Sequence, residues 1–228
     1  MLRWHQDGAW HGMNWAEFAR QTASVARHLR QAGVSAGDRV LIVSENRPEY
    51  PIAETALLAI RAVPVPAYVT NTVEDHAHVL RDCGARAAIV SSAALAGRVA
   101  AAGPLSLLVT MQDVPTPGVR HLHFADLTGD AAAPDDIAAE AALIPGGALA
   151  CLIYTSGTGG APKGVMLPHR AVLSNCRGAF HLLRTLWRME GGAPHETYLS
   201  YLPLSHSFEH TAGQFFMLST GAEVVYAR

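Results

Sequence analysis

Tyr154-Thr155-Ser156-Gly157-Thr158-Gly159-Gly160-Ala161-Pro162-Lys163-Gly164 is the stretch of this sequence that decides the fold and points to a chemistry. It places four glycines, three aliphatic hydroxyls and one lysine within eleven residues, directly after the apolar run 148–153. Glycines let a backbone approach a ligand closely and point successive N–H groups at it, and a lysine adds a compact positive charge. The stretch therefore predicts a loop that follows a buried strand and holds a polyphosphate.

Three other glycine-rich signatures do not fit this stretch. The Walker loop needs Ser or Thr directly after Gly-Lys, but Lys163 follows Pro162 and precedes Gly164. The dinucleotide fingerprint needs a glycine where Pro162 stands, and the nucleophile elbow needs one where Tyr154 stands. A plain turn has no need of this set of hydroxyls, glycines and lysine, so a phosphate-binding loop is the favoured interpretation.

The composition is that of a globular protein without a strong charge. The 228 residues are 50% hydrophobic and 16% charged, with a formal net charge of −2, and such a chain can bury a large core. This balance does not indicate nucleic-acid binding, and the apolar runs are shorter than the ~20 residues that span a bilayer. Cys83, Cys151 and Cys176 form no CxxC pair, so we expect reduced thiols and a cytoplasmic protein.

Strand and helix patterns alternate along the chain, which indicates an α/β fold of mostly parallel sheets flanked by helices. Strands are expected at 39–43, 63–66, 87–90, 105–110, 148–153, 165–167, 198–202 and 223–226, and helices at 15–30, 48–60, 72–83, 93–102, 136–142, 169–187 and 208–218. We expect a first α/β subdomain with a connecting segment over residues 1–145. The start of a second α/β subdomain, which carries the glycine-rich loop, is expected over residues 146–228.

Residues 154–164 resemble the phosphate-binding signature of the adenylate-forming superfamily, which contains acyl- and aryl-CoA synthetases, adenylation domains of peptide synthetases and beetle luciferases. The family pattern Tyr-Thr-Ser-Gly-Thr-Thr-Gly-x-Pro-Lys-Gly is matched at every fixed position but one, because Gly159 replaces the second Thr. Residues 202–210 resemble the next core motif, and their Ser-His-Ser-Phe-Glu form is most similar to long-chain fatty acyl-CoA synthetases. Residues 38–46 and 63–66 resemble early family strands more weakly.

This resemblance implies the N-terminal part of the adenylate-forming enzyme fold and a reaction in two steps. An acid carboxylate, such as that of a fatty acid, attacks the α-phosphate of ATP to give an acyl-adenylate and pyrophosphate, and the thiol of coenzyme A then attacks the activated carbonyl. Mg²⁺ would accompany ATP, and no protein metal ligand is predicted in this chain. The resemblance implies catalytic roles for Lys163 and His206, and phosphate binding by Thr155, Ser156, Gly157, Thr158, Gly159, Gly160 and Lys163.

Other interpretations stay open at this point. Within the superfamily, an aryl-CoA ligase or a carrier-protein-loading adenylation domain is the runner-up, and a non-catalytic nucleotide-binding or scaffold module is the alternative of another class. His206, Glu209 and His210 also spell the H-x-x-E-H pattern of some zinc hydrolases, although the Leu-Pro-Leu before them is a poor start for a helix. His76, with His78 and Cys83, is expected to lie on a solvated helix face.

By comparison with the superfamily, several parts of the site are expected after residue 228. These are the adenine-contacting motif, the magnesium-binding Glu, the ribose-binding Asp and the C-terminal catalytic Lys. We therefore expect the chain to be the first part of a larger fatty acid–CoA ligase and the 228 residues alone not to turn over. A sheet edge left open in this way would favour self-association.

Overall fold

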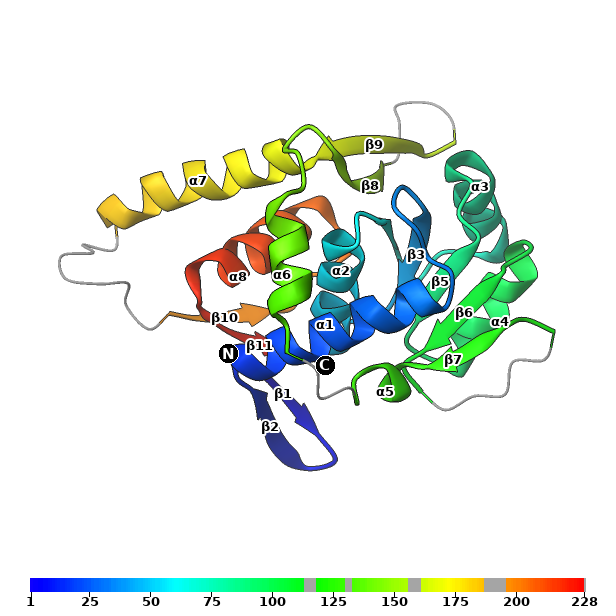
Figure 1. The fold of residues 1–228 in the computed structure, drawn as a ribbon, viewed down its shortest axis with the longest axis horizontal. Helices are drawn as coiled ribbons and strands as arrows, with labels where there is room; N and C mark the ends of the chain where they lie inside the picture. The colour runs from blue at the N-terminus through cyan, green and yellow to red at the C-terminus, as the bar shows by residue number, and fades with distance from the viewer. Residues whose placement is uncertain (113–117, 130–132, 156–160, 187–195, 228) are drawn as a thin grey trace.

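A parallel sheet of five strands forms the centre of the first half of the chain (Figure 1). The computed structural model describes residues 1–112, 118–129, 133–155, 161–186 and 196–227. In spatial order the strands are β4 (Val63–Ala67), β3 (Arg39–Val43), β5 (Ala87–Val90), β6 (Leu107–Thr110) and β7 (His121–His123). The predicted parallel α/β arrangement is confirmed.

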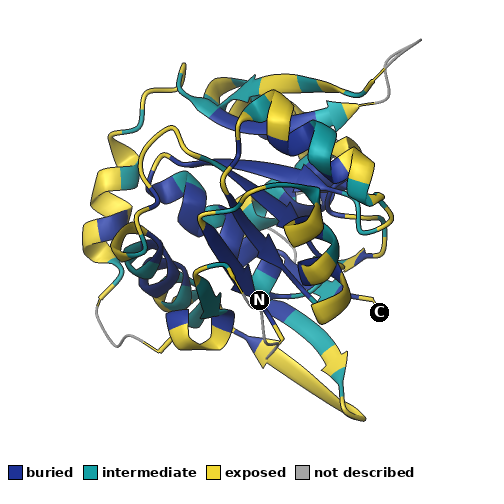
Figure 2. Ribbon diagram, turned by 90° about the vertical axis from the view of Figure 1, so that its right-hand side faces the viewer, coloured by how far each residue is buried: buried dark blue, intermediate teal, exposed yellow. Residues whose placement is uncertain are grey.

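Helices cover both faces of this sheet. The helices of the first half are α1 (Trp15–Gln31), α2 (Glu49–Ala59), α3 (Val73–Cys83), α4 (Ala93–Ala102), α5 (Phe124–Leu127) and α6 (Asp135–Ala142). Successive strand residues point to opposite faces. Val40 and Ile42 therefore pack in the core that α1 and α2 complete, whereas Leu41 and Val43 pack in the core that α3 and α4 complete. Figure 2 shows these strands buried and the outer helix faces exposed.

Side chains cap the predicted helix starts of α1, α3 and α4. The Asn14 side chain accepts a hydrogen bond from the Glu17 backbone N–H at 2.9 Å at the start of α1. Thr72 and Asp75 form a reciprocal capping box at the start of α3. Such caps satisfy backbone N–H groups that have no partner within the helix.

The second sheet joins the two ends of the described chain. Its order is β10 (Thr197–Ser200), β11 (Glu223–Tyr226), β1 (Leu2–Gln6) and β2 (Ala9–Met13). β1 runs parallel to β11, and β2 folds back antiparallel onto β1. The sequence patterns did not predict β1 and β2. Hydrogen bonding thus crosses the expected boundary near residue 145, and the two-subdomain division stays a prediction.

The stretch that carries the glycine-rich loop is a hairpin rather than part of a parallel sheet. β8 (Leu149–Thr155) and β9 (Lys163–Pro168) pair antiparallel, and α7 (His169–Leu186) follows directly. α7 extends along the long axis of the molecule (yellow in Figure 1). None of the described helices is both long and apolar enough to cross a bilayer.

The segment after β10 differs from the expected regular α-helix. It is a π-helix, η1 (Glu209–Phe216), which continues into the short α8 (Met217–Thr220). Within it Gly213 faces the Glu209 carboxyl group, because a Cβ on Gly213 would lie 2.5 Å from the Glu209 Cδ atom. The wider turn and the missing Cβ leave room for a buried carboxylate, and π-helical turns are frequent at functional sites.

The histidines of α3 do not lie on a solvated face, so that prediction is wrong. His76 is fully buried, and His78 is half-buried with its Nε2 2.8 Å from the carbonyl oxygen of Pro162. Cys83 is half-buried as well. The physical reason is that α3 lies between α4 and the β8–β9 hairpin, and both neighbours cover it.

Candidate functional site

The two ends of the glycine-rich loop are held together by the β8–β9 hairpin. Thr155 ends β8 and stands opposite Lys163, which begins β9, and Tyr154 stands opposite Gly164 in the next pair. The predicted phosphate contacts of residues 156–160 lie outside the described residues. The hairpin therefore brings together two of the predicted site residues, Thr155 and Lys163, although they are eight positions apart in the chain.

Helix α3 contacts both ends of the loop. The Tyr154 hydroxyl donates a hydrogen bond to Asp82 Oδ2 at 2.6 Å, and the Nε2 of His78 lies 2.8 Å from the carbonyl oxygen of Pro162. The rings of His78 and Tyr154 also meet edge to face at 6.2 Å. Burial and the Asp82 carboxylate raise the pKa of Tyr154, so its hydroxyl stays a donor at neutral pH.

Lys163 carries the positive charge of this region. Its side chain is exposed at the start of β9. Lys163 is the single lysine of the sequence, and the other 16 of the 17 basic residues are arginines. An exposed ammonium group next to a loop rich in N–H donors and hydroxyls can bind phosphate oxygens, and the protein does not have to bury this charge before the ligand binds.

His206 lies in the turn between β10 and η1, on a different element from Lys163. Its side chain is exposed, whereas the preceding Leu204 and Ser205 are buried. The His206 backbone N–H donates to the Pro203 carbonyl oxygen at 2.8 Å, and the Phe208 N–H donates to His206 Nδ1 at 3.3 Å. With Nδ1 accepting, the neutral ring carries its proton on Nε2, which is then the donor that a carboxylate or phosphate oxygen could meet.

A buried polar network lies beneath this turn. Glu209 accepts hydrogen bonds from the Tyr198 hydroxyl at 2.8 Å and the Ser200 hydroxyl at 2.6 Å. On its other side, His210 Nε2 lies 2.5 Å from Glu54 Oε1 of α2. Burial and the hydrogen bond to Glu209 raise the pKa of Tyr198.

This network argues against the zinc hydrolase interpretation. Glu209 faces β10, His210 faces α2, and the His206 side chain is exposed, so the three side chains have different surroundings. Among the described residues, no group of three or more His, Cys, Asp or Glu side chains could hold a metal ion. A hydrolytic zinc site needs at least three converging ligands, which this geometry does not provide.

Asn46 and Glu54 also contact the segments on either side of His206. The sequence patterns did not predict these contacts. Asn46 follows β3 and bonds to the segment before His206, and Glu54 is a fully buried carboxylate in α2. The available signal for Glu54 was that it is the one charged residue in the largely apolar run 50–60. For Asn46 the available signal was its place after a buried strand, and its partners lie more than 150 positions away in the chain.

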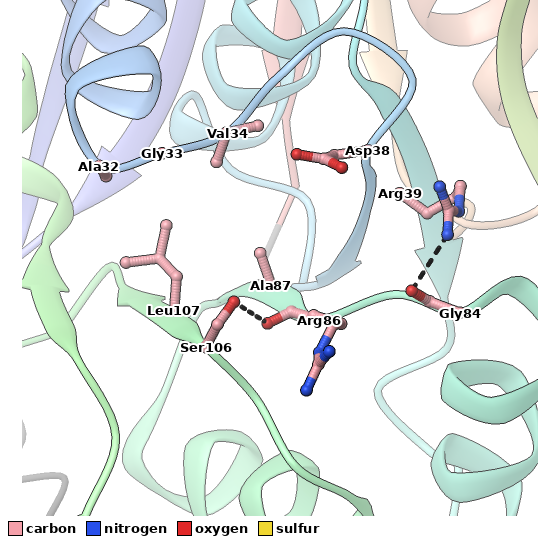
Figure 3. Close-up of a pocket in the computed structure, with 10 residues that line it drawn as sticks. All are labelled: Ala32, Gly33, Val34, Asp38, Arg39, Gly84, Arg86, Ala87, Ser106 and Leu107. Atoms are coloured by element: carbon pink, nitrogen blue, oxygen red, sulfur yellow. Dashed lines mark hydrogen bonds between the residues drawn. The ribbon is translucent and has the colours of Figure 1, made fainter.

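Two hollows of the described surface lie apart from these residues. One lies at the amino ends of β3, β5 and β6 and includes Asp38, Arg39 and Arg86 (Figure 3). The Arg39 guanidinium there donates to the carbonyl oxygens of Cys83, Gly37 and Gly84, so it ties loops together. The other, largely apolar, lies between α1, α2, α6, α7 and η1. Neither hollow is lined by Thr155, Lys163 or His206.

Two acid–CoA ligases are similar to this chain in sequence. The chain is 35% identical over 201 residues to the long-chain-fatty-acid–CoA ligase FadD15 of Mycobacterium tuberculosis, covering 88% of the chain and 33% of that protein. It is 34% identical over 166 residues to a 3-hydroxybenzoate–CoA/4-hydroxybenzoate–CoA ligase of Thauera aromatica, covering 66% of the chain and 29% of that protein. The chain thus spans about a third of the length of the curated relatives it matches.

Solved structures share the fold of the described residues. MbtA of Mycobacterium smegmatis aligns with a TM-score of 0.79 at 24% identity, over 99% of this chain and 40% of that chain. Acetoacetyl-CoA synthetase of Streptomyces lividans aligns with a TM-score of 0.77 at 20% identity, over 99% of this chain and 35% of that chain. The sequence model described as "AMP-binding enzyme" matches residues 2–228, and the chain therefore belongs to this family of adenylate-forming enzymes.

Proposed function

We propose that this chain supplies the phosphate-binding loop and the His206 turn of an ATP-dependent fatty acid–CoA ligase. In the first step the carboxylate oxygen of the acid attacks the α-phosphorus of ATP, and the bond to the leaving pyrophosphate breaks. In the second step the sulfur of coenzyme A attacks the acyl carbonyl and AMP leaves. The observation that carries the proposal is the Thr155–Lys163 pair, which closes the glycine-rich loop on a hairpin with the lysine exposed.

Lys163 and the loop would act on the β- and γ-phosphates by position and charge. A charge pair at 4 Å is worth about 4 kcal/mol at an effective dielectric of 20, and solvent lowers this value for an exposed lysine. Phosphoryl transfer asks a protein mainly to place groups and neutralise charge, so a loop held at both ends suits the task. Thr155 would add a neutral donor beside Lys163.

His206 would meet the acid carboxylate and the α-phosphate. Its exposed ring, with Nδ1 accepting from the Phe208 N–H, presents Nε2 as a donor. A donor aimed at the oxygens on which charge develops stabilises the transition state without reorganising at the moment of reaction.

Mg²⁺ would arrive with ATP rather than in a cage made by this chain. Mg²⁺ is usually held by substrate phosphates and one or two carboxylates. The described residues gather no set of three candidate ligands, so their donors do not fit an all-protein magnesium site. Magnesium would neutralise phosphate charge when bound.

The long-chain acid is proposed because FadD15, a long-chain-fatty-acid–CoA ligase, matches 88% of the chain at 35% identity. The similar identity to a hydroxybenzoate–CoA ligase over 66% of the chain keeps an aryl acid as the second candidate. For both candidates we propose coenzyme A as the acceptor and the cytoplasm as the location. Hydrolysis-resistant acyl-adenylate mimics with a long alkyl or a benzoyl group separate them, because the preferred acid should give the tighter complex.

Amine labelling of Lys163 tests the loop assignment directly. An amine-selective ester can react with only two groups of this sequence, the Lys163 ε-amine and the Met1 α-amine, and peptide mass spectrometry resolves them. We expect saturating ATP to slow Lys163 labelling about tenfold, because an ammonium bound to phosphate is a poor nucleophile. Met1 serves as the internal control.

A matched pair of variants completes this test. Lys163→Ala should weaken ATP binding in calorimetry, whereas Lys163→Arg, which keeps the charge, should retain part of it. ATP binding of wild-type strength by Lys163→Ala, or equal labelling of Lys163 with and without ATP, would contradict the assignment. Binding of ATP by the wild type without any binding of acyl-adenylate mimics would favour the non-catalytic nucleotide-binding module.

A further inference from the structure

Asn46 binds the segment before His206 with every polar atom of its side chain. Its Nδ2 donates to the Ser200 hydroxyl at 3.0 Å and to the Leu202 carbonyl oxygen at 2.7 Å, and its Oδ1 accepts from the Leu204 N–H at 3.0 Å. Asn46 is only 8% exposed. These contacts join residues at least 154 positions apart in the chain.

Asn46 lies at an edge of the five-stranded sheet where ligands bind in similar folds. Asn46 follows the carboxyl end of β3, whose neighbours are β4 and β5. The chain connects β3 to β4 and then returns to β5, so the strand order reverses beside β3. In doubly wound sheets, ligands bind outside the carboxyl ends at such a point. Here the segment 200–204 occupies part of that edge, tied there by Asn46.

Glu54 holds the segment after His206. Its two carboxylate oxygens meet His210 Nε2, at 2.5 Å, and the Gln214 side-chain amide. All three side chains are at most 2% exposed. Asn46 lies in the connection between β3 and α2, and Glu54 lies in α2, so neighbouring parts of one β3–α2 unit hold the turn on both sides of His206.

We infer that Asn46 and Glu54 are positioning residues for His206. The buried Asn46 side chain has a partner for each of its polar atoms, and buried hydrogen bonds of this kind favour a single geometry. In the Glu54 cluster both carboxylate oxygens are bonded, whereas His210 Nδ1 and Gln214 Oε1 have no hydrogen-bond partner within the described residues. His206 itself is exposed and has room to reach a ligand, whereas the backbone on either side is tied to β3 and α2. This role rests on the proposed function, because it places His206 against the acid carboxylate and the α-phosphate.

Hydrogen–deuterium exchange tests whether the two residues hold the segment. Asn46→Ala removes all three side-chain bonds, and we expect amides of residues 202–210 to exchange at least about tenfold faster. Glu54→Gln, which keeps the side-chain size, should speed exchange over residues 208–214. Ser24→Ala is the matched control, because it removes a buried hydroxyl bond to the Leu127 carbonyl oxygen away from the turn.

Ligand affinity separates a positioning role from a merely structural one. Asn46→Ala should weaken binding of a long-chain acyl-adenylate mimic about tenfold, while ATP binding, which depends on Lys163, changes by less than about twofold. Asn46→Asp keeps the acceptor for the Leu204 N–H and should give an intermediate loss, which serves as a second variant should Asn46→Ala fold poorly.

The outcomes distinguish failure of this inference from failure of the proposed function. Unchanged exchange over residues 202–210 in both Asn46 variants, or unchanged mimic affinity despite faster exchange, would overturn the positioning role. A protein that carries the motifs expected after residue 228 and still binds neither ATP nor the mimic would overturn the proposed function and the role of His206 with it. The exchange measurement would then still report whether Asn46 and Glu54 tie the segment down.

Discussion

His76 should make the stability of this protein fall as the pH drops below neutral. Its side chain is fully buried, and neither ring nitrogen has a hydrogen-bond partner within the described residues. Burial, and then the Arg98 guanidinium, lower the pKa of His76 from 6.5 to about 4. A proton on this ring is therefore much less stable in the folded protein than in the unfolded chain.

The sign and size of the effect follow from this difference in pKa. Because the folded-state pKa of His76 is depressed below 6.5, its contribution is fully present above that pH and is lost as the pH falls toward about 4. From about pH 7 to about pH 5, the unfolded chain binds a proton that the folded protein does not, which lowers the free energy of unfolding by about 2 kcal/mol. His169, whose pKa burial also lowers, adds in the same direction.

Urea denaturation at a series of pH values measures this loss. His76→Phe removes the titrating ring and should flatten most of the pH dependence, leaving the smaller share of His169. His181→Asn, at an exposed position of α7, is the matched control and should keep the wild-type slope. If His76→Phe and the wild type lose the same free energy between about pH 7 and pH 5, the reasoning from burial is refuted.

Three further predictions concern single contacts. Gly213→Ala should lower the free energy of unfolding by about 1–3 kcal/mol in thermal melts, because its Cβ would overlap the Glu209 carboxyl group; an unchanged melting temperature would show that this turn can relax. Tyr154→Phe removes the 2.6 Å bond to Asp82 and should cost about 1 kcal/mol, with faster amide exchange at the end of β8; protection equal to wild type would count against the anchor on α3. Thr72→Ala removes the α3 cap and should cost about 1 kcal/mol in urea denaturation, whereas Thr72→Ser should restore it.

Local sequence patterns were enough to predict most elements of the first half. The helix at Trp15–Gln31 and the strands at Arg39–Val43 and Ala87–Val90 are found where apolar periodicity placed them. The apolar residues of each such pattern all pack against the same core. Their spacing in the sequence is therefore enough to predict the helix or strand. The positions of the two strands that flank the glycine-rich loop were predictable, although their antiparallel pairing was not.

Long-range pairing was beyond such patterns. Leu2 pairs with Val224, so the first strand belongs to a sheet completed by the last one. Four of the five β2 residues are exposed and the fifth, Met13, is buried, so no alternation marks this strand. The π-helical turn at Glu209–Phe216 was also missed, because it depends on the carboxylates of Glu209 and Glu54 and on their distant partners.

Local spacing of apolar residues was enough to predict the parallel sheet, and the resemblance of residues 154–164 to a known signature was enough to identify the family. The folded structure was needed to show that Thr155 pairs with Lys163, that His76 is buried, and that Asn46 and Glu54 hold the segments on either side of His206. The physical reason is that burial and hydrogen-bond partners belong to pairs of elements. One position in a sequence identifies its own side chain, but it does not identify the distant residue that packs against it in the folded protein.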